Sequence, residues 1–263
     1  MKIKSVVRSF LIVSALTLAI LMVMVCLCIN LIMFHPVGSY DGTCPGYVDI
    51  GTNGIRIAAV ARGVAKGRKV ILHCHGNAED MIQSLDMYAG ALARGYGVAA
   101  VDYPGYGLSD GSPSEGGCYR NVHRLYDWLV EVCGVRPEDV IVVGFSIGTG
   151  PATELAATQR VGGLVLMAPY LSAPRIVTRI RLLPIDPFPN LERIARVDCP
   201  VTVIHGTEDR IIPFAHGRRL FALANEPKRF LAVEGAGHND LAIRLGAARL
   251  EDLFPAISMP SAE

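Results

Sequence analysis

Residues 140–148 read VIVVGFSIG, and this is the most informative stretch of the chain. A run of β-branched and apolar residues leads directly into Gly144-Phe145-Ser146-Ile147-Gly148, and residues 149–159 are compatible with a helix. A strand, a sharp turn and a helix form the context in which the serine of Gly-x-Ser-x-Gly becomes an exposed nucleophile. Glycines are expected on both sides, because side chains there would clash as strand and helix close. The sequence therefore predicts Ser146 as a nucleophile.

The partners that a nucleophilic serine needs follow later in the chain, since it requires a base and the base requires an orienting acid. Residues 201–213 (VTVIHGTEDRIIP) read as a strand and a loop that carries Asp209, and residues 230–240 (FLAVEGAGHND) read as a strand and a glycine-rich loop that carries His238. The order Ser, Asp, His is that of α/β-hydrolases. Glu208 is the alternative acid, and Asp209 is preferred because it lies closer to the usual pattern of this loop.

An oxyanion hole is expected beside the nucleophile, because acyl transfer needs two N–H donors aimed at the developing negative charge. Residues 69–75 (KVILHCH) read as a buried strand that runs into Gly76-Asn77-Ala78. The predicted donors are the main-chain N–H groups of Asn77 and of Ile147, the residue after the serine.

The motifs together resemble the α/β-hydrolase superfamily, and within it the branch of the eukaryotic protein depalmitoylases with their bacterial and fungal relatives. The resemblance implies triad roles for Ser146, Asp209 and His238, and a structural role for the loop that begins at Asp102. Depalmitoylases are held on the membrane by a lipidated, cysteine-rich N-terminus, and this chain departs from that pattern. The matching stretches are HGNAED (75–80), DYPGYGLSDGSPSE (102–115), GVRPEDVIVVGFSIGTGPA (134–152), FPN (188–190), VIHGTEDRIIPFAHG (203–217) and VEGAGHNDL (233–241).

The N-terminus reads as a membrane anchor. Residues 10–34 are 25 residues without a charge, which as a helix is roughly 37 Å, enough for a hydrocarbon core of about 30 Å. Lys2, Lys4 and Arg8 precede this span. The positive-inside rule then predicts a single-pass protein with a cytoplasmic N-terminus and the hydrolase domain on the non-cytoplasmic face. The alternatives are a cleaved signal peptide, although no Ala-x-Ala site follows, and a domain that faces the cytoplasm.

The predicted organisation is a basic segment (1–9), a transmembrane helix (10–34), a linker (35–46), one α/β-hydrolase domain (47–256) and a tail (257–263). The net charge of +1 gives no indication of nucleic-acid binding, and the oligomeric state is not indicated. Strand patterns alternate with helix patterns, which predicts a mostly parallel sheet covered by helices on both faces. The strands are expected at 69–75, 98–102, 140–145, 163–168, 201–205 and 229–234, and the helices at 78–94, 115–133, 149–159, 213–224 and 240–253.

Two further features concern the edges of this domain. Asn53-Gly54 separates two short strand patterns, so the sheet is expected to open with an antiparallel hairpin. Only residues 169–197 are available for a lid, so a minimal lid and an open site are expected. The apolar residues of this segment are interleaved with arginines. It is either an acyl-chain groove or lipid-facing surface, or an ordinary amphipathic connection.

The cysteines and histidines predict neither a disulfide framework nor a metal or cofactor site. Among seven cysteines, Cys44 and Cys118 are expected to be the more exposed, and their pairing cannot be deduced. His73-Cys74-His75 has no further ligand that would complete a metal set.

The function that these observations favour is a membrane-anchored serine hydrolase that cleaves fatty-acyl esters or thioesters of a lipid or an acylated protein. One alternative is a serine peptidase of the prolyl-aminopeptidase-like group, which shares this fold and triad but needs an acidic pocket for the substrate amine. The other is a non-catalytic scaffold with the hydrolase fold, which the loss of a triad member would mark.

Overall fold

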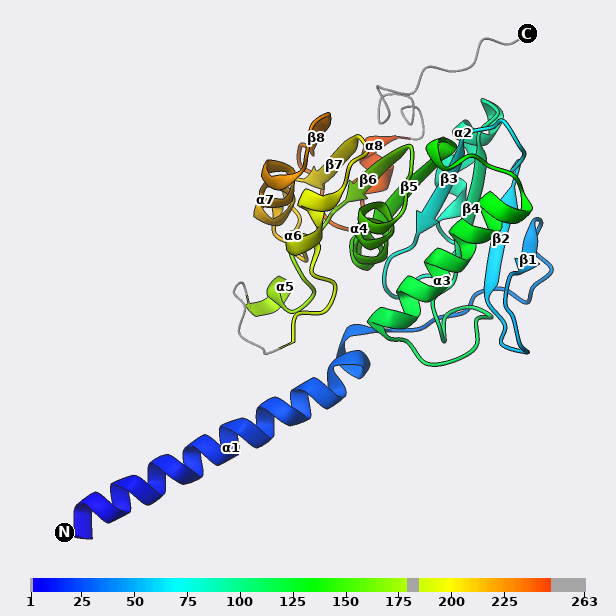
Figure 1. Cartoon of the computed structure of the whole chain (residues 1–263). Helices are drawn as coiled ribbons and strands as arrows, with labels where there is room; N and C mark the ends of the chain where they lie inside the picture. The colour runs from blue at the N-terminus through cyan, green and yellow to red at the C-terminus, as the bar shows by residue number, and fades with distance from the viewer. Residues whose placement is uncertain (1, 179–184, 247–263) are drawn as a thin grey trace.

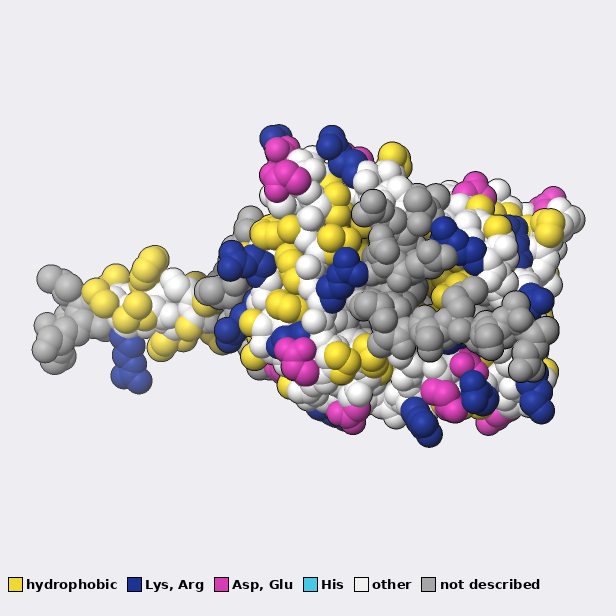
Figure 2. All heavy atoms as spheres, turned by 90° about the horizontal axis from the view of Figure 1, so that it is seen from above, with side chains coloured by type: hydrophobic (Ala, Val, Ile, Leu, Met, Phe, Trp, Pro, Cys, Tyr) yellow, Lys and Arg dark blue, Asp and Glu magenta, His cyan; other side chains and the backbone are white. Residues whose placement is uncertain are grey.

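A long N-terminal helix and an eight-stranded sheet make up the part of the chain that the computed structural model describes, residues 2–178 and 185–246. The helix, α1 (Lys2–Met33), leaves the domain as a separate rod (Figure 1). Its window Val6–Val25 has a mean hydropathy of 2.4 and is not buried against the domain. Hydrophobic side chains cover the rod where it projects from the body (Figure 2). By length and composition α1 could cross a membrane, as an anchor or as a signal sequence does.

The sheet has the order β1-β2-β4-β3-β5-β6-β7-β8. Strands β1 and β2 form the predicted antiparallel hairpin, and β2 also runs antiparallel to β4. All remaining neighbours are parallel, so the predicted mostly parallel sheet is confirmed. The strands are β1 (Tyr47–Asp49), β2 (Ala58–Arg62), β3 (Val70–Cys74), β4 (Gly97–Val101), β5 (Val140–Phe145), β6 (Gly163–Met167), β7 (Val201–Gly206) and β8 (Lys228–Val233).

Helices cover both faces of the sheet, and the strands alternate their side chains between two hydrophobic clusters. Leu72 and Val142 belong to the cluster under α3 (Glu115–Asp127), α4 (Thr149–Thr158) and α7 (Phe214–Leu223). Ile71 and Ile141 belong to the opposite cluster, under α2 (Ala89–Ala93) and α8 (Leu241–Leu245). Two buried faces explain why the central strands are continuously apolar.

One predicted helix is wrong in its first half. The sequence pattern placed a helix over 78–94, but the chain becomes helical only at the 3₁₀ turn Leu85–Tyr88, which leads into α2. Ala78 has a φ of +55°, which a right-handed helix cannot accommodate. Asp80 then accepts hydrogen bonds from the N–H groups of Ile82 and Gln83 and holds a turn in place of a helix.

The other expected helices are present, but the helix expected over 240–253 ends already at Leu245, where Gly246 takes a φ of +74°. The helix expected over 115–133 continues past α3 as one π-helical turn, Trp128–Val132. The segment between β6 and β7 contains only short helices among its described residues: α5 (Arg175–Thr178), α6 (Asn190–Arg193) and the 3₁₀ turn Ile194–Arg196. Residues 179–184 of the expected lid, 247–253 of the last expected helix and the tail 257–263 lie outside the described residues.

Candidate active site

Ser146 stands at the sharp turn between β5 and α4, where its φ is +52°. This left-handed conformation is strained for a residue with a side chain, by about 1–3 kcal/mol. The flanking glycines are sterically required. A Cβ atom on Gly144 would lie 2.6 Å from the carbonyl oxygen of Gly148, and one on Gly148 would lie 2.1 Å from the carbonyl oxygen of Cys74. The strand, turn and helix predicted around Ser146 are all present.

His238 joins Ser146 to Asp209. Its Nε2 lies 2.9 Å from the Ser146 Oγ, and its Nδ1 lies 2.7 Å from the Asp209 Oδ2. The three residues follow β5, β7 and β8, whose carboxyl ends meet at one edge of the parallel sheet. This series of contacts can carry the proton of a serine hydroxyl to an imidazole whose other nitrogen is held by a carboxylate.

Asp209 is buried in a set of hydrogen bonds that favour its charged form. Its Oδ1 accepts from the N–H groups of Ile211 (2.9 Å) and Ile212 (2.8 Å). Burial by itself raises the pKa of Asp209, but the hydrogen bonds from His205, His238 and Ile212 outweigh it and hold the pKa well below the usual range. The neighbouring Glu208 is exposed. Of the two acids considered from the sequence, Asp209 is the one that contacts His238.

His205 is a site residue that the sequence analysis missed. It is buried near the end of β7, and its Nε2 lies 3.0 Å from the Ile212 carbonyl oxygen and 3.5 Å from the Asp209 Oδ2. The available signal was its place at the carboxyl end of a strand, four residues before the acid. His205 therefore supports the loop that presents Asp209.

The two predicted oxyanion donors lie in turns that follow neighbouring strands, Asn77 after β3 and Ile147 after β5. The turns are in contact, since a Cβ on Gly76 would lie 3.0 Å from a ring atom of Phe145. Within the described residues the main-chain N–H of Asn77 donates no hydrogen bond, and the Tyr170 hydroxyl fixes the Ile147 main chain through its carbonyl oxygen at 2.9 Å. The turn of Asn77 thus follows the strand that neighbours β5, and the role of Asn77 and Ile147 as oxyanion donors stays a prediction.

Asp102 lies apart from these contacts. It is fully buried, and its carboxylate accepts hydrogen bonds from the Met81 N–H (2.8 Å) and from the Tyr40 hydroxyl. Burial is the main cause that raises the pKa of Asp102 to about 6. The His75 Nε2 lies 3.6 Å away. These contacts join the segment that contains Tyr40 to the loops that follow β3 and β4, at the carboxyl edge of the sheet.

The prediction about one cysteine is wrong. Cys118 is buried on α3, 1% exposed, so the expectation that it is among the more exposed cysteines is wrong. The reason is that α3 turns this side of the helix onto the sheet. In the described part of the chain, no group of three His, Cys, Asp or Glu residues is placed to hold a metal ion.

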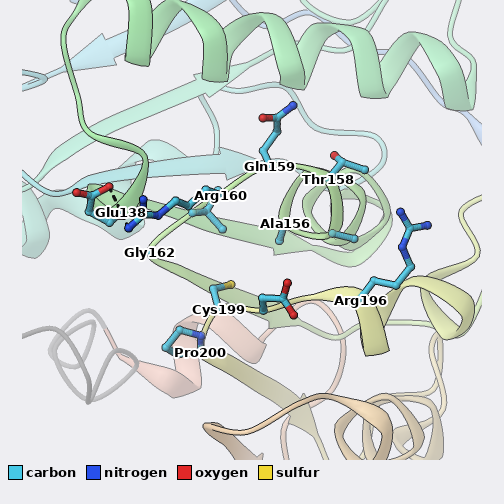
Figure 3. Close-up of a pocket in the computed structure, with 12 residues that line it drawn as sticks. Glu138, Ala156, Thr158, Gln159, Arg160, Gly162, Arg196, Cys199 and Pro200 are labelled. Atoms are coloured by element: carbon cyan, nitrogen blue, oxygen red, sulfur yellow. Dashed lines mark ion pairs between the residues drawn. The ribbon is translucent and has the colours of Figure 1, made fainter.

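A hollow of about 590 Å³ lies at the opposite edge of the sheet (Figure 3). Gly162 and Pro200, just before β6 and β7, line it together with Arg160, Arg196 and Glu138. The Arg160 guanidinium and the Glu138 carboxylate are 3.9 Å apart, and the figure marks this ion pair. The hollow is thus separated from Ser146 by the length of the strands.

Comparison with known proteins agrees with this architecture. A sequence model described as alpha/beta hydrolase fold matches residues 69–188. Alpha/beta hydrolase domain-containing protein 17B of Homo sapiens is 38% identical over 194 residues, which cover 72% of this chain and 67% of that protein. The Xenopus laevis protein of the same name is 39% identical with the same coverage.

Solved structures share the fold at lower identity. Mouse alpha/beta hydrolase domain-containing protein 10 superimposes with a TM-score of 0.63 and 18% identity, over 82% of this chain and 100% of the other. Est1E of Butyrivibrio proteoclasticus, solved with ferulic acid bound, gives a TM-score of 0.63 at 15% identity, over 79% and 99% of the two chains. With the fold, the site geometry and relatives of this similarity in hand, we conclude that the chain belongs to the α/β-hydrolase family and is a hydrolase enzyme.

Proposed function

We propose that this hydrolase is a membrane-anchored serine hydrolase that cleaves fatty-acyl esters or thioesters through an acyl-enzyme on Ser146. The observation that carries the proposal is the unbroken series of contacts from the Ser146 Oγ through His238 to Asp209. Support comes also from the strained turn that presents the serine and from the charged state of Asp209.

In the proposed mechanism the Nε2 of His238 takes the proton of Ser146 as its Oγ attacks the acyl carbonyl carbon. Asp209 holds the imidazole through Nδ1 and stabilises the imidazolium that forms. The main-chain N–H groups of Asn77 and Ile147 hold the oxyanion. His238 then gives its proton to the leaving alcohol or thiol. Water, activated by the same histidine, releases the fatty acid and restores Ser146.

The fatty-acyl class is supported by the surroundings of the site. The sequence resembles the depalmitoylase branch, and the connection between β6 and β7 is short and rich in apolar residues. Ile176 and Leu171 of this connection are partly buried against the core. A short, apolar cover suits a flexible acyl chain better than a large polar substrate.

The proposal is tested with Ser146→Ala in the full-length protein. Labelling by a fluorophosphonate probe should be abolished, and turnover of p-nitrophenyl esters and acyl-thioesters should fall by at least about 10⁴-fold, because the triad acts as a unit. The unaltered enzyme should prefer octanoyl over acetyl substrates, since each buried methylene contributes about 0.8 kcal/mol. Undiminished labelling of the variant would point to another serine, and faster cleavage of aminoacyl amides would favour a peptidase.

We further propose that α1 is an uncleaved anchor with its N-terminus in the cytoplasm. The basic side of the span carries Lys2, Lys4 and Arg8, and such an excess favours the cytoplasmic face. The protein should stay in the membrane fraction after carbonate washing. A phosphatase that needs export should be active when fused after Glu263, and a fluorescent protein that fails on export should be dark. The opposite reporter pattern would place the domain in the cytoplasm, and a soluble protein would indicate cleavage.

A further inference from the structure

The segment that follows α1 is built into the edge of the sheet that carries the site. We call residues 33–40 the strap. Phe34 is only 4% exposed, and its ring meets the Phe188 ring edge-on at 6.1 Å. Phe188 lies in the connection between β6 and β7, beside α4, because a Cβ on Gly150 would lie 2.3 Å from its ring. The strap therefore begins as part of the core, directly at the end of the helix.

The side chain of Asn77 holds the start of the strap. Its Nδ2 donates to the carbonyl oxygen of Met33 at 2.8 Å, and its Oδ1 accepts from the His35 N–H at 3.0 Å. The Tyr106 hydroxyl donates to the same Oδ1 at 2.6 Å, and it accepts from the His35 N–H at 3.1 Å. Both ends of the Asn77 amide are thus used to join the turn after β3 to the strap.

The rest of the strap contacts the neighbouring loops. The carbonyl oxygen of Val37 accepts from the Gly107 N–H at 2.7 Å. Ser39 donates to the Asp80 carboxylate through its N–H (2.7 Å) and its hydroxyl (2.5 Å). Tyr40 donates to Asp102. The strap is therefore fixed along its length to the loops that follow β3 and β4.

The turn that contains Asn77 is held at Gly76, whose N–H donates to the Glu79 carboxylate, and at Asn77 through the contacts of its side chain. It belongs to no helix or strand, and the next residue, Ala78, takes a φ of +55°. An oxyanion donor must lie within about 3.1 Å of the oxyanion. A displacement of about 1 Å can reduce the rate by about 100-fold. The side-chain contacts of Asn77 thus bear directly on where its own main-chain N–H points.

We infer that the strap positions the oxyanion hole, with the side chain of Asn77 as the positioning residue. The inference rests on the proposed function, in which the Asn77 N–H holds the oxyanion. Replacing the side chain of Asn77 retains its main-chain N–H group. A loss of rate would therefore report a displacement of that N–H group. Because the Met33 carbonyl ends α1 and is itself bonded to Asn77, the helix and the oxyanion turn form one connected unit. An anchored enzyme would hold this edge of the sheet toward the bilayer, on the side where α1 leaves the domain (Figure 1).

The test uses Asn77→Ala in the full-length protein, with p-nitrophenyl butyrate as a soluble substrate and fluorophosphonate titration to count active sites. The kcat per titrated site should fall by about 10- to 100-fold, with KM unchanged within about twofold. Tyr106→Phe removes one of the two donors to the Asn77 Oδ1, so kcat should fall by about threefold to tenfold. Tyr126→Phe is the matched control, because it removes a tyrosine hydroxyl that donates to the Arg160 carbonyl oxygen, outside the strap and the turn after β3, and its kcat should change by less than about twofold.

The inference is overturned if kcat per titrated site is unchanged in both Asn77→Ala and Tyr106→Phe. It is also overturned if these variants only lower the number of titratable sites, since that marks a role in folding alone. Should Asn77→Ala not fold, the comparison of Tyr106→Phe with Tyr126→Phe decides. Failure of the proposed function is seen separately, as turnover that persists in Ser146→Ala.

Discussion

The two edges of the sheet differ in the burial and hydrogen bonding of their polar side chains. At the carboxyl edge, Asp209, His238 and Asp102 are buried and hydrogen-bonded to other loops. At the amino edge, the hollow of about 590 Å³ is lined by Arg160 and Arg196, which are exposed. Burying a polar group is unfavourable unless a hydrogen-bond partner replaces the lost water. The buried and hydrogen-bonded polar groups therefore indicate that the functional site lies at the carboxyl edge.

Strained backbone conformations also lie mostly at the carboxyl edge of the sheet. Five residues other than glycine have a positive φ, among the residues that the structure describes. Asn53 belongs to the turn of the β1–β2 hairpin. Ala78, Ser146 and Ala168 come shortly after the carboxyl ends of β3, β5 and β6, and Phe188 lies further along the connection between β6 and β7. Such conformations persist only where the surrounding contacts enforce them. Strained backbone and buried polar partners together therefore mark the carboxyl edge as the functional one.

The largest effect is expected from the acid at the carboxyl edge. Asp209→Asn should lower kcat by about 10³- to 10⁴-fold, because an amide in place of the carboxylate stabilises the wrong tautomer of His238. Steady-state kinetics on a soluble ester measure this. Glu208→Gln is the matched control, since this acid is exposed, and it should change kcat by less than about tenfold. A reversed outcome for the two variants would show that the wrong acid is assigned.

A smaller effect is expected on stability, from Asp102. Its folded-state pKa of about 6 lies above the unfolded value near 3.9. Between these values the folded state keeps the proton that the unfolded state has lost, so stability falls as the pH rises. The loss relative to Asp102→Asn, which does not titrate, should reach about 3 kcal/mol above pH 6. Urea unfolding of both proteins at pH 4, 5, 6 and 7 measures it. A difference between the two proteins that stays constant with pH would contradict the prediction.

The smallest effect is expected at the amino edge. Arg160→Ala and Arg196→Ala should each leave kcat and KM unchanged within about twofold, because exposed ion pairs contribute at most about 1 kcal/mol and lie far from the reacting atoms. Ester hydrolysis by the purified variants measures this. A tenfold change in either variant would break the distinction between the two edges.

Several features could be predicted from the sequence because they depend on local pattern. The period of apolar residues indicated the strands that became β3 to β8, and Asn53-Gly54 indicated the hairpin. Gly-x-Ser-x-Gly after a strand, followed by an acid and a histidine after later strands, indicated which residues would meet. Parallel strands place their carboxyl ends at one edge, so the order of motifs along the chain was enough to bring Ser146, Asp209 and His238 together.

Only the tertiary structure decided the features that depend on contacts across the chain. The pattern of 78–94 is helical, yet the left-handed Ala78 and the turn held by Asp80 delay the helix until Leu85. Residues 35–46 read as a linker, but its first residues, 35–40, belong to the strap and are bonded to Asn77, Asp80 and Asp102. No periodicity reports such pairings, because the partners lie about 40 to 60 residues apart and each contact is satisfied only after the sheet has formed.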